Sequence, residues 1–263
     1  MAVELCRVDT PPAWTGTPVR VHLRNTHQPY VFQGPDHLTH SAFVADITCD
    51  YLRSRAHRAK EGEPFFAVAG FYAPHAPLNP PPRFLDRYNV NEMPLPHRAD
   101  GENFVDPESG IPVTDAQWKI IRQHYYALIS HVDACIGQIL RVLDELDLSD
   151  DTLVIFTSDH GENLGDHGLI QKTQSYDSSA RVPLIVKPPA APVSADPVPE
   201  ASAASDGIRR AAGFAELVDV APTIMEYCGI PAPPFFQGLS LRRAIASAGG
   251  SRPPAYADDG AAV

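Results

Sequence analysis

The sequence predicts an α/β fold in which a mostly parallel central sheet is flanked by helices, and two observations lead to this prediction. Three short runs, at 64–72, 152–158 and 182–189, are apolar without alternation, as expected for strands that are buried on both faces. Amphipathic helical patterns at 38–59 and 115–147 alternate with these runs. Such alternation is typical of a layered α/β domain.

Composition limits the classes of function. The 263 residues are 44% hydrophobic and 20% charged, so the chain can bury a substantial core. The net charge of -11 argues against non-specific nucleic-acid binding, which needs cations to replace the counterions of phosphates. No nucleic-acid partner is therefore expected.

The cysteines and the N-terminus give further limits. The four cysteines are far apart and form no C-x-x-C pair, so they are expected to be small buried hydrophobes. No apolar run approaches membrane-spanning length, and residues 1–12 lack the apolar region of a signal peptide. We expect no membrane partner, and a cytoplasmic location if this start is genuine; the sequence favours no oligomeric state.

The first half of the chain contains one predicted helix and one predicted strand. Residues 1–37 are an irregular, Pro-rich segment. A helix follows at 38–59, with Thr39 or Ser41 as its cap. Its apolar face is expected at Phe43, Ile47 and Leu52. The strand at 64–72 ends at a proline, and residues 89–113 are polar and irregular.

The second half contains the strongest helix pattern. Thr114 and Gln117 form a capping box, and apolar residues then recur every three or four positions to 147. The strands at 152–158 and 182–189 follow, and then a segment of linker composition at about 190–213. A last helix is expected at 219–228, with Pro222 in its first turn and Gly229 at its end.

The run TSDHGENLGDHGLIQK, at 157–172, carries the residues most suited to chemistry. Asp159 and His160 directly follow a predicted strand, and open α/β sheets bind ligands at the carboxyl ends of their strands. A carboxylate beside an imidazole suits a divalent cation. The alternative is that Asp159 caps a helix, with Glu162 completing a capping box. Three glycines within the next nine residues weaken this alternative.

His75 and Lys172 are further candidates for this site, and their membership depends on where the predicted elements place them. His75 lies in the loop after the strand at 64–72, so parallel strands would bring it near Asp159. Lys172 could hold an oxyanion such as sulfate or phosphate. The plain alternatives are a surface histidine and a solvated lysine. No nucleophile is evident, because Ser158 and Cys6 have no base nearby, and no phosphate-binding P-loop motif occurs.

Three segments resemble the type I sulfatases of the alkaline phosphatase superfamily. They are TLVIFTSDHGENLGDHGLIQKTQSYDSSARVPLIV, FFAVAGFYAPHAPLNPPPRF and LVDVAPTIMEYCGIP with the later FQGLSL. The resemblance covers most of 38–245 and keeps the order of the family's segments. It implies an alkaline phosphatase-like α/β core over 38–245, interrupted by the linker.

The resemblance assigns a role to each candidate residue. Asp159 and His160 match the second pair of metal ligands, which implies calcium, with Mg²⁺ or Mn²⁺ as alternatives. Lys172 matches a lysine that contacts sulfate oxygens. His75 matches a histidine that contacts the sulfate or the leaving-group oxygen, although Ala73 stands where several members have another lysine.

Other positions of the family pattern are altered or missing. Asp166 and His167 match a recurrent pair that we interpret as shaping the loop. The family oxidises the Cys or Ser of a C/S-x-P/A-x-R motif to formylglycine, whose hydrate attacks sulfur, and an Asp-Asp pair supplies further metal ligands. Neither occurs in residues 1–37, N-terminal to the part of the chain that the resemblance covers. Residues 246–263 resemble the start of a C-terminal subdomain, so the resemblance implies a fold that is incomplete at both ends.

The function that the resemblance implies is metal-dependent hydrolysis of a sulfuric ester, with a small sulfate ester or related oxyanion as the partner. Because formylglycine is not encoded at its expected place, we expect the chain alone to be inactive, as a fragment of the enzyme. A phosphonate or phosphodiester hydrolase of the same superfamily is the alternative enzyme. A non-catalytic, anion-binding remnant is the alternative from another class.

Overall fold

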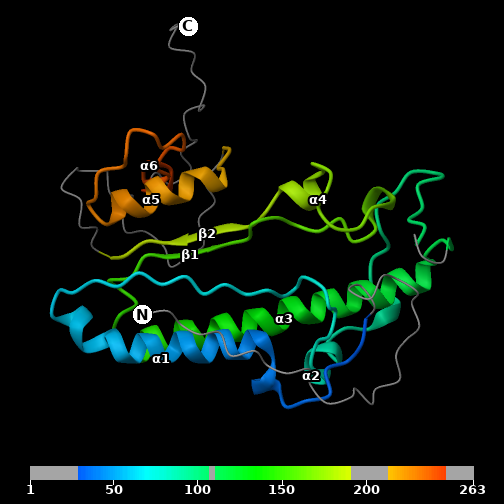
Figure 1. Cartoon of the computed structure of the whole chain (residues 1–263), viewed down its shortest axis with the longest axis horizontal. Helices are drawn as coiled ribbons and strands as arrows, with labels where there is room; N and C mark the ends of the chain where they lie inside the picture. Colours follow the sequence, from blue (N-terminus) through cyan, green and yellow to red (C-terminus); the bar gives the residue numbers. More distant parts are fainter. Residues whose placement is uncertain (1–28, 107–109, 191–212, 247–263) are drawn as a thin grey trace, which may run out of the picture. The chain divides into compact units, whose positions relative to one another are not determined.

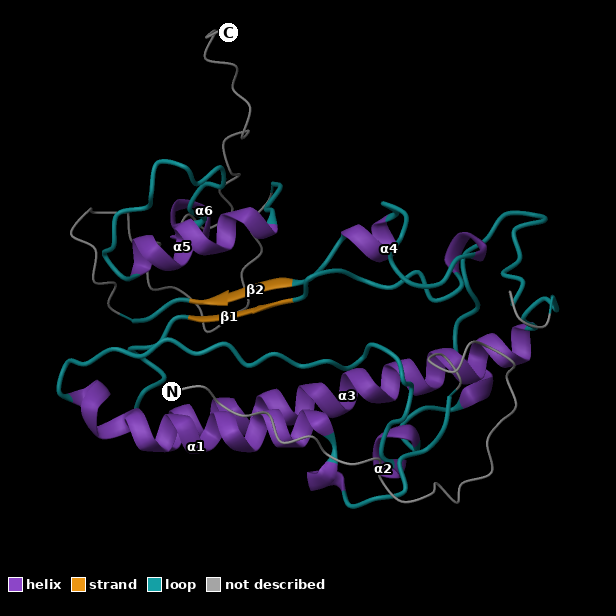
Figure 2. Ribbon diagram, viewed as in Figure 1, coloured by secondary structure: helices purple, strands orange, loops and turns teal. Residues whose placement is uncertain are grey.

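The computed structural model describes residues 29–106, 110–190 and 213–246 (Figures 1 and 2). The chain divides into two compact units. The first comprises Met1–Asp147 and His160–Arg181, and the second comprises Leu148–Asp159 and Val182–Val263. Most of the N-terminal segment, the linker and the tail that the sequence predicts lie outside the described residues.

The first unit is built on two long helices that pack side by side, α1 (His40–Lys60) and α3 (Asp115–Glu145) (Figure 1). It also contains the short helices α2 and α4 and three 3₁₀ turns. Their bounds are η1 (Asp36–Leu38), α2 (Pro82–Leu85), η2 (Val90–Glu92), η3 (Asp166–Gly168) and α4 (Asp177–Ala180).

Helix α1 confirms the predicted helix at 38–59, but its buried face differs from the prediction. Thr39 caps the helix, since its Oγ1 accepts a hydrogen bond from the Ala42 N–H at 3.2 Å. Phe43 and Ile47, which were expected to face the core, are 59% and 50% exposed. Leu52 is buried as predicted, and the other buried side chains of the helix are Ser41, Val44, Ala45 and Cys49. Most of these residues are small, which suits the packing of α1 on α3.

Helix α3 confirms the second predicted helix and its capping box. The Gln117 N–H donates to Thr114 Oγ1 at 3.3 Å, and the Thr114 N–H donates to Gln117 Oε1 at 2.8 Å. By length and composition alone α3 could cross a membrane. Eleven of its side chains are buried, and it packs on α1 and α2. The expectation that the chain has no membrane partner stays a prediction.

The apolar run at 64–72 is not a strand, and this part of the prediction is wrong. The segment is extended, but no backbone hydrogen bond joins 64–71 to any other described segment. Phe66 and Val68 are 69% and 80% exposed. A strand exists only with a hydrogen-bonded neighbour, and none of the described segments supplies one.

Aromatic contacts place this extended segment along α1 instead. The rings of Tyr51 and Phe65 lie 6.3 Å apart, and those of His40 and Tyr72 also lie 6.3 Å apart. Because the later residue of the segment meets the earlier residue of the helix, the two run in opposite directions. Figure 1 shows the segment as the cyan trace beside α1.

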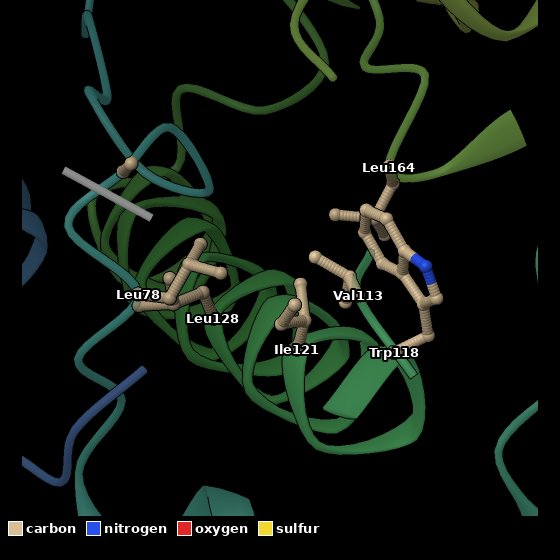
Figure 3. Close-up of a cluster of buried hydrophobic side chains, with 7 residues drawn as sticks. Leu78, Val113, Trp118, Ile121, Leu128 and Leu164 are labelled. Carbon is tan, nitrogen blue, oxygen red and sulfur yellow. The ribbon is translucent and has the colours of Figure 1, made fainter. Parts of the chain in front are cut away.

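The core of the first unit lies against one face of α3 (Figure 3). Trp118, Ile121 and Leu128 come from the helix, and three separate loops pack on them. The loop residues are Ala76, Leu78, Val113 and Leu164. The loop of His75 and the loop of the Asp-His-Gly motif therefore share α3 as their support.

The second unit contains the two strands that the structure describes, β1 (Val154–Thr157) and β2 (Leu184–Lys187). They confirm the predicted strands at 152–158 and 182–189. The two strands pair antiparallel, from Val154 opposite Lys187 to Thr157 opposite Leu184. A mostly parallel central sheet is therefore not seen in the described residues. Ile185 is 61% exposed, because a two-stranded sheet cannot bury both of its faces.

Helix α5 (Val220–Tyr227) confirms the last predicted helix, and it follows the turn η4 (Leu217–Asp219). Pro222 lies in its first turn, and Gly229 follows its end with a φ of 67°. The buried carboxylate of Asp219 accepts hydrogen bonds from the backbone N–H groups of Glu216 and Leu239, at 2.9 and 2.8 Å. These bonds tie α5 to the segment before α6 (Arg242–Ala246).

Candidate functional site

The candidate loop begins where β1 ends, and no helix starts there. Residues 158–163 are irregular. Glu162 does not complete a capping box with Asp159: its Oε1 accepts hydrogen bonds from the backbone N–H groups of Leu164 and Gln171. The helix-capping alternative for Asp159 is therefore wrong.

The loop has an unusual backbone, which explains its glycines. Five residues have φ in the left-handed region, and they are Leu164, Gly165, His167, Gly168 and Gln171. A Cβ at Gly165 would lie 2.6 Å from Pro96 and 3.0 Å from the indole of Trp118. Left-handed backbone is costly for residues other than glycine, so tertiary contacts must hold this conformation.

A buried arginine on α3 supplies such contacts. Arg122 is 8% exposed, and its Nε and Nη2 donate to the carbonyl of Leu164 at 3.3 and 3.2 Å. Its Nη2 also donates to Asp166 Oδ1, which accepts the His97 N–H at 2.8 Å. Asp166 thus shapes the loop through a charge-assisted contact with the core helix.

The two ends of the loop are tied to each other. The Asn163 N–H donates to the carbonyl of Gln171 at 3.0 Å, and the Glu162 carboxylate accepts the Gln171 N–H. The Gly161 N–H donates to the carbonyl of Ser179 at 2.7 Å. His160 and Lys172 are the residues that adjoin these tied positions.

His167 packs against His97 and Tyr176. Its ring stacks on Tyr176 with centroids 3.9 Å apart, and His97 meets it edge-on at 5.6 Å. Its N–H donates to the carbonyl of His97 at 2.7 Å. These contacts, like those of Asp166, fix the shape of the turn.

His75 and His160 share the same local geometry. The Nδ1 of His75 lies 2.9 Å from the carbonyl oxygen of Ala76, and the Nδ1 of His160 lies 2.8 Å from that of Gly161. A carbonyl only accepts, so each Nδ1 carries a proton, and in the neutral ring Nε2 is the nitrogen with a lone pair. This tautomer is the one that a metal ligand or a proton acceptor at Nε2 requires.

The ring of Tyr72 also restrains His75. The two ring centroids lie 4.7 Å apart at an angle of 47°, and the His75 N–H donates to the carbonyl of Tyr72 at 3.1 Å. Lys172, in contrast, is exposed and makes no ion pair or hydrogen bond with the residues that the structure describes. Its ammonium group could bind an anion without losing a contact to the described residues.

The four predicted site residues are divided between the two units. His75, His160 and Lys172 belong to the first unit, on loops that α3 supports, whereas Asp159 belongs to the second unit. Within the first unit, no hydrogen bond or ion pair joins His75, His160 and Lys172 to one another among the residues that the structure describes. Their convergence on one pocket stays a prediction.

The metal ligands are also incomplete among the described residues. No three His, Cys, Asp or Glu side chains there gather closely enough to hold an ion. Calcium takes six to eight oxygen ligands, so Asp159 and His160 would supply only one side of such a site. The donor types fit a divalent cation, but their number does not fit tight binding.

Arg122 and Tyr125 are two residues near the loop that the sequence did not mark as functional. Burial raises the pKa of the Tyr125 hydroxyl, and the carboxylate of Glu162 raises it further. A charged residue within the apolar stripe of α3, three positions before Tyr125 and one after Ile121, was the available signal for Arg122.

One run in the chain matches the letters of the formylglycine motif, but its structure differs from a nucleophile loop. Ser54-Arg55-Ala56-His57-Arg58 follows the S-x-A-x-R pattern and lies inside α1. The Ser54 hydroxyl donates to the carbonyl of Tyr51 at 2.6 Å, one turn earlier in the helix. The run is part of a regular helix, and we assign it no catalytic role.

Comparison with known proteins establishes the family. A family model described as Sulfatase matches residues 18–230. The multifunctional alkaline phosphatase superfamily protein PehA of Trinickia caryophylli is 32% identical over 79% of this chain and 41% of its own length. An arylsulfatase of Clostridium perfringens is 31% identical over 77% of the chain and 41% of its own length. The chain belongs to the sulfatase family.

Further relatives and solved structures agree with this result. Iduronate 2-sulfatase of Mus musculus is 30% identical over 86% of the chain and 50% of its own length. The phosphonate monoester hydrolase of Agrobacterium radiobacter superposes with a TM-score of 0.69 at 25% identity, covering 92% of this chain and 47% of that one. The likeness confirms the α/β fold class. The chain spans about half the length of the curated relatives it matches.

Proposed function

We propose that the chain carries part of the active site of a metal-dependent sulfuric ester hydrolase, and that its partner is a small-molecule sulfate ester. The observation that carries this proposal is the loop at 158–172. Its motif belongs to a segment that resembles the sulfatases, and Arg122 and Asp166 hold it against α3. A loop fixed in this way can present His160 and Lys172 at constant positions.

Each candidate has a role that suits its chemistry. Lys172 would offer its ammonium to the sulfate oxygens, and His75 would contact the sulfate or the leaving-group oxygen through Nε2. Asp159 and His160 would hold one side of a divalent cation, expected to be Ca²⁺ with Mg²⁺ or Mn²⁺ as alternatives. When bound, this cation would polarise the sulfate oxygens.

The anion site is tested by isothermal titration calorimetry, in which inorganic sulfate is added to the purified chain and the heat of binding is measured. We expect the Lys172→Met variant to lose most of the sulfate affinity, because it removes the cation that faces the anion. Lys60→Met is the matched control, since Lys60 is an exposed lysine paired with Asp147 elsewhere in the first unit. Equal affinity of the two variants would contradict the assignment of Lys172.

We further propose that this chain alone does not turn over a sulfate ester. The nucleophile motif is not encoded at its expected place, and Ser54 lies in a helix. Purified chain should release no 4-nitrophenol from 4-nitrophenyl sulfate above background, with or without added Ca²⁺. Hydrolysis that rises with chain concentration and disappears in Lys172→Met would overturn this proposal.

A phosphonate or phosphodiester hydrolase is the second candidate. The observation that favours it is the superposition on two phosphonate monoester hydrolases, with TM-scores of 0.69 and 0.66. Competition between sulfate, inorganic phosphate and methylphosphonate separates the two, because the preferred anion should displace the others. A stable chain that binds none of them, and no divalent ion, would instead favour the non-catalytic remnant.

A further inference from the structure

Arg122 makes contacts that go beyond stabilising the core. It is one of the few charged side chains that the structure buries, and it directs both of its bonded nitrogens at one loop. Nε and Nη2 converge on the carbonyl of Leu164, and Nη2 reaches Asp166. Burying a guanidinium costs desolvation free energy, which only well-formed hydrogen bonds and ion pairs offset. A buried arginine is therefore weak evidence of a role in stability alone.

The contacts of Arg122 fall where the loop backbone is least favourable. Leu164, the residue whose carbonyl it binds, has a φ of 47°, and Gly165 follows with a φ of 94°. From this turn the Gly165 N–H donates to the carbonyl of Leu169 at 2.8 Å, which closes the loop upon itself. Arg122 therefore compensates a left-handed turn that the loop would not adopt unaided.

The effect reaches the candidate residues through the tied ends of the loop. Once the turn is closed, Gln171 is held from both sides, by the N–H of Asn163 and by the carboxylate of Glu162. Lys172 is the next residue. The path from the guanidinium to Lys172 thus runs through the hydrogen bonds of the loop.

We propose that Arg122 is a positioning residue for the oxyanion site: it sets the conformation of 164–171 and thereby the place of Lys172. The inference rests on the proposed function for its anion. Arg122 itself does not touch the anion, so its removal should act on affinity through loop order and not through charge at the site.

The test combines amide hydrogen exchange with titration of inorganic sulfate, on the full chain. In Arg122→Met, the amides of Asn163, Gly165 and Gln171 should exchange faster by on the order of tenfold, and sulfate affinity should fall with them. Arg122→Lys keeps the charge but can reach fewer acceptors, so both effects should be intermediate.

Two controls separate positioning from general stability. Arg141→Met removes an exposed arginine from the same helix and should behave as the unaltered chain in both measurements. Leu143→Ala removes a buried side chain near the other end of α3 and should lower the midpoint of unfolding. It should nevertheless leave loop exchange and sulfate affinity unchanged, which a merely structural role for Arg122 does not predict.

The possible results divide clearly. Unchanged loop exchange in Arg122→Met overturns the proposal, and so does a loss of sulfate affinity without faster exchange, since this would indicate direct contact. If Arg122→Met does not fold, Asp166→Asn decides, because it weakens the same tie while keeping an acceptor for the His97 N–H. If the unaltered chain does not bind sulfate, the proposed function is contradicted. The hydrogen-exchange result then still shows whether Arg122 fixes the conformation of the loop.

Discussion

Gly165 shows at the scale of one residue why the candidate loop needs its composition. Its φ of 94° is open to glycine, and the space beside it is filled by Pro96 and Trp118. The sequence indicated that glycines exclude a helix here, but it could not show which of them is required by packing. That requirement arises from residues distant in sequence, on α3 and in the loop before it.

Gly165→Ala should destabilise the chain by about 2–4 kcal/mol, because the left-handed backbone and the overpacking add. Gly101→Ala is the matched control, since Gly101 has a φ of 86° but no atom within 4 Å of its added Cβ. Its cost should be only the backbone part, about 1 kcal/mol. Urea unfolding measures both, and equal costs would show that packing at Gly165 is not restrictive.

At the scale of elements, the patterns in the sequence predicted helices better than strands. The capping box at Thr114 and the helix that follows it are local features, and the structure confirms both. The run at 64–72 has the composition of a buried strand, but pairing depends on a partner elsewhere in the fold. For the same reason, the residues of β1 and β2 do not by themselves reveal that the two strands pair antiparallel.

Val68→Lys distinguishes the structure from the sequence-based expectation. In the structure Val68 is 80% exposed, so the lysine should change the free energy of unfolding by less than about 0.5 kcal/mol. It should also reduce self-association, because it places a charge on an unpaired extended segment. A loss of several kcal/mol in urea unfolding would show that 64–72 is a buried strand after all.

At the scale of the whole molecule, two buried histidines of α3 link stability to pH. Burial lowers the pKa of both His124 and His131 below the ordinary value of 6.5, and hydrogen bonding to the carbonyl of Ile120 only partly offsets this for His124. A lowered folded-state pKa means that the unfolded chain binds more protons. Stability is therefore complete above about pH 6.5 and is lost as the pH falls toward the lowered values.

Urea unfolding between pH 8 and pH 5 should show this loss, with at most about 1.4 kcal/mol per pH unit from each histidine. His124→Gln should flatten the dependence, because the glutamine does not titrate. His57→Gln, at an exposed histidine, should keep the original slope. A slope unchanged in His124→Gln would show that His124 takes no part in the linkage.

The family relationship and the candidate residues followed from the motif in the sequence, but their convergence did not. Separation in sequence hides which loops share a support, and the structure identifies α3 as the support for the loops of His75 and Lys172. Asp159 belongs to the second unit, and its place beside them stays a prediction.

The central prediction is that residues 75, 159, 160 and 172 converge on one pocket, where Asp159 and His160 hold a divalent cation and His75 and Lys172 contact the oxyanion. An NMR titration with inorganic sulfate tests it most directly, by following the side-chain resonances of His75, His160 and Lys172 together with the Asp159 amide. We predict that all four shift along one saturation curve, while His57 and Lys60 do not move. Separate midpoints, or shifts at only one of the four, would contradict a shared site.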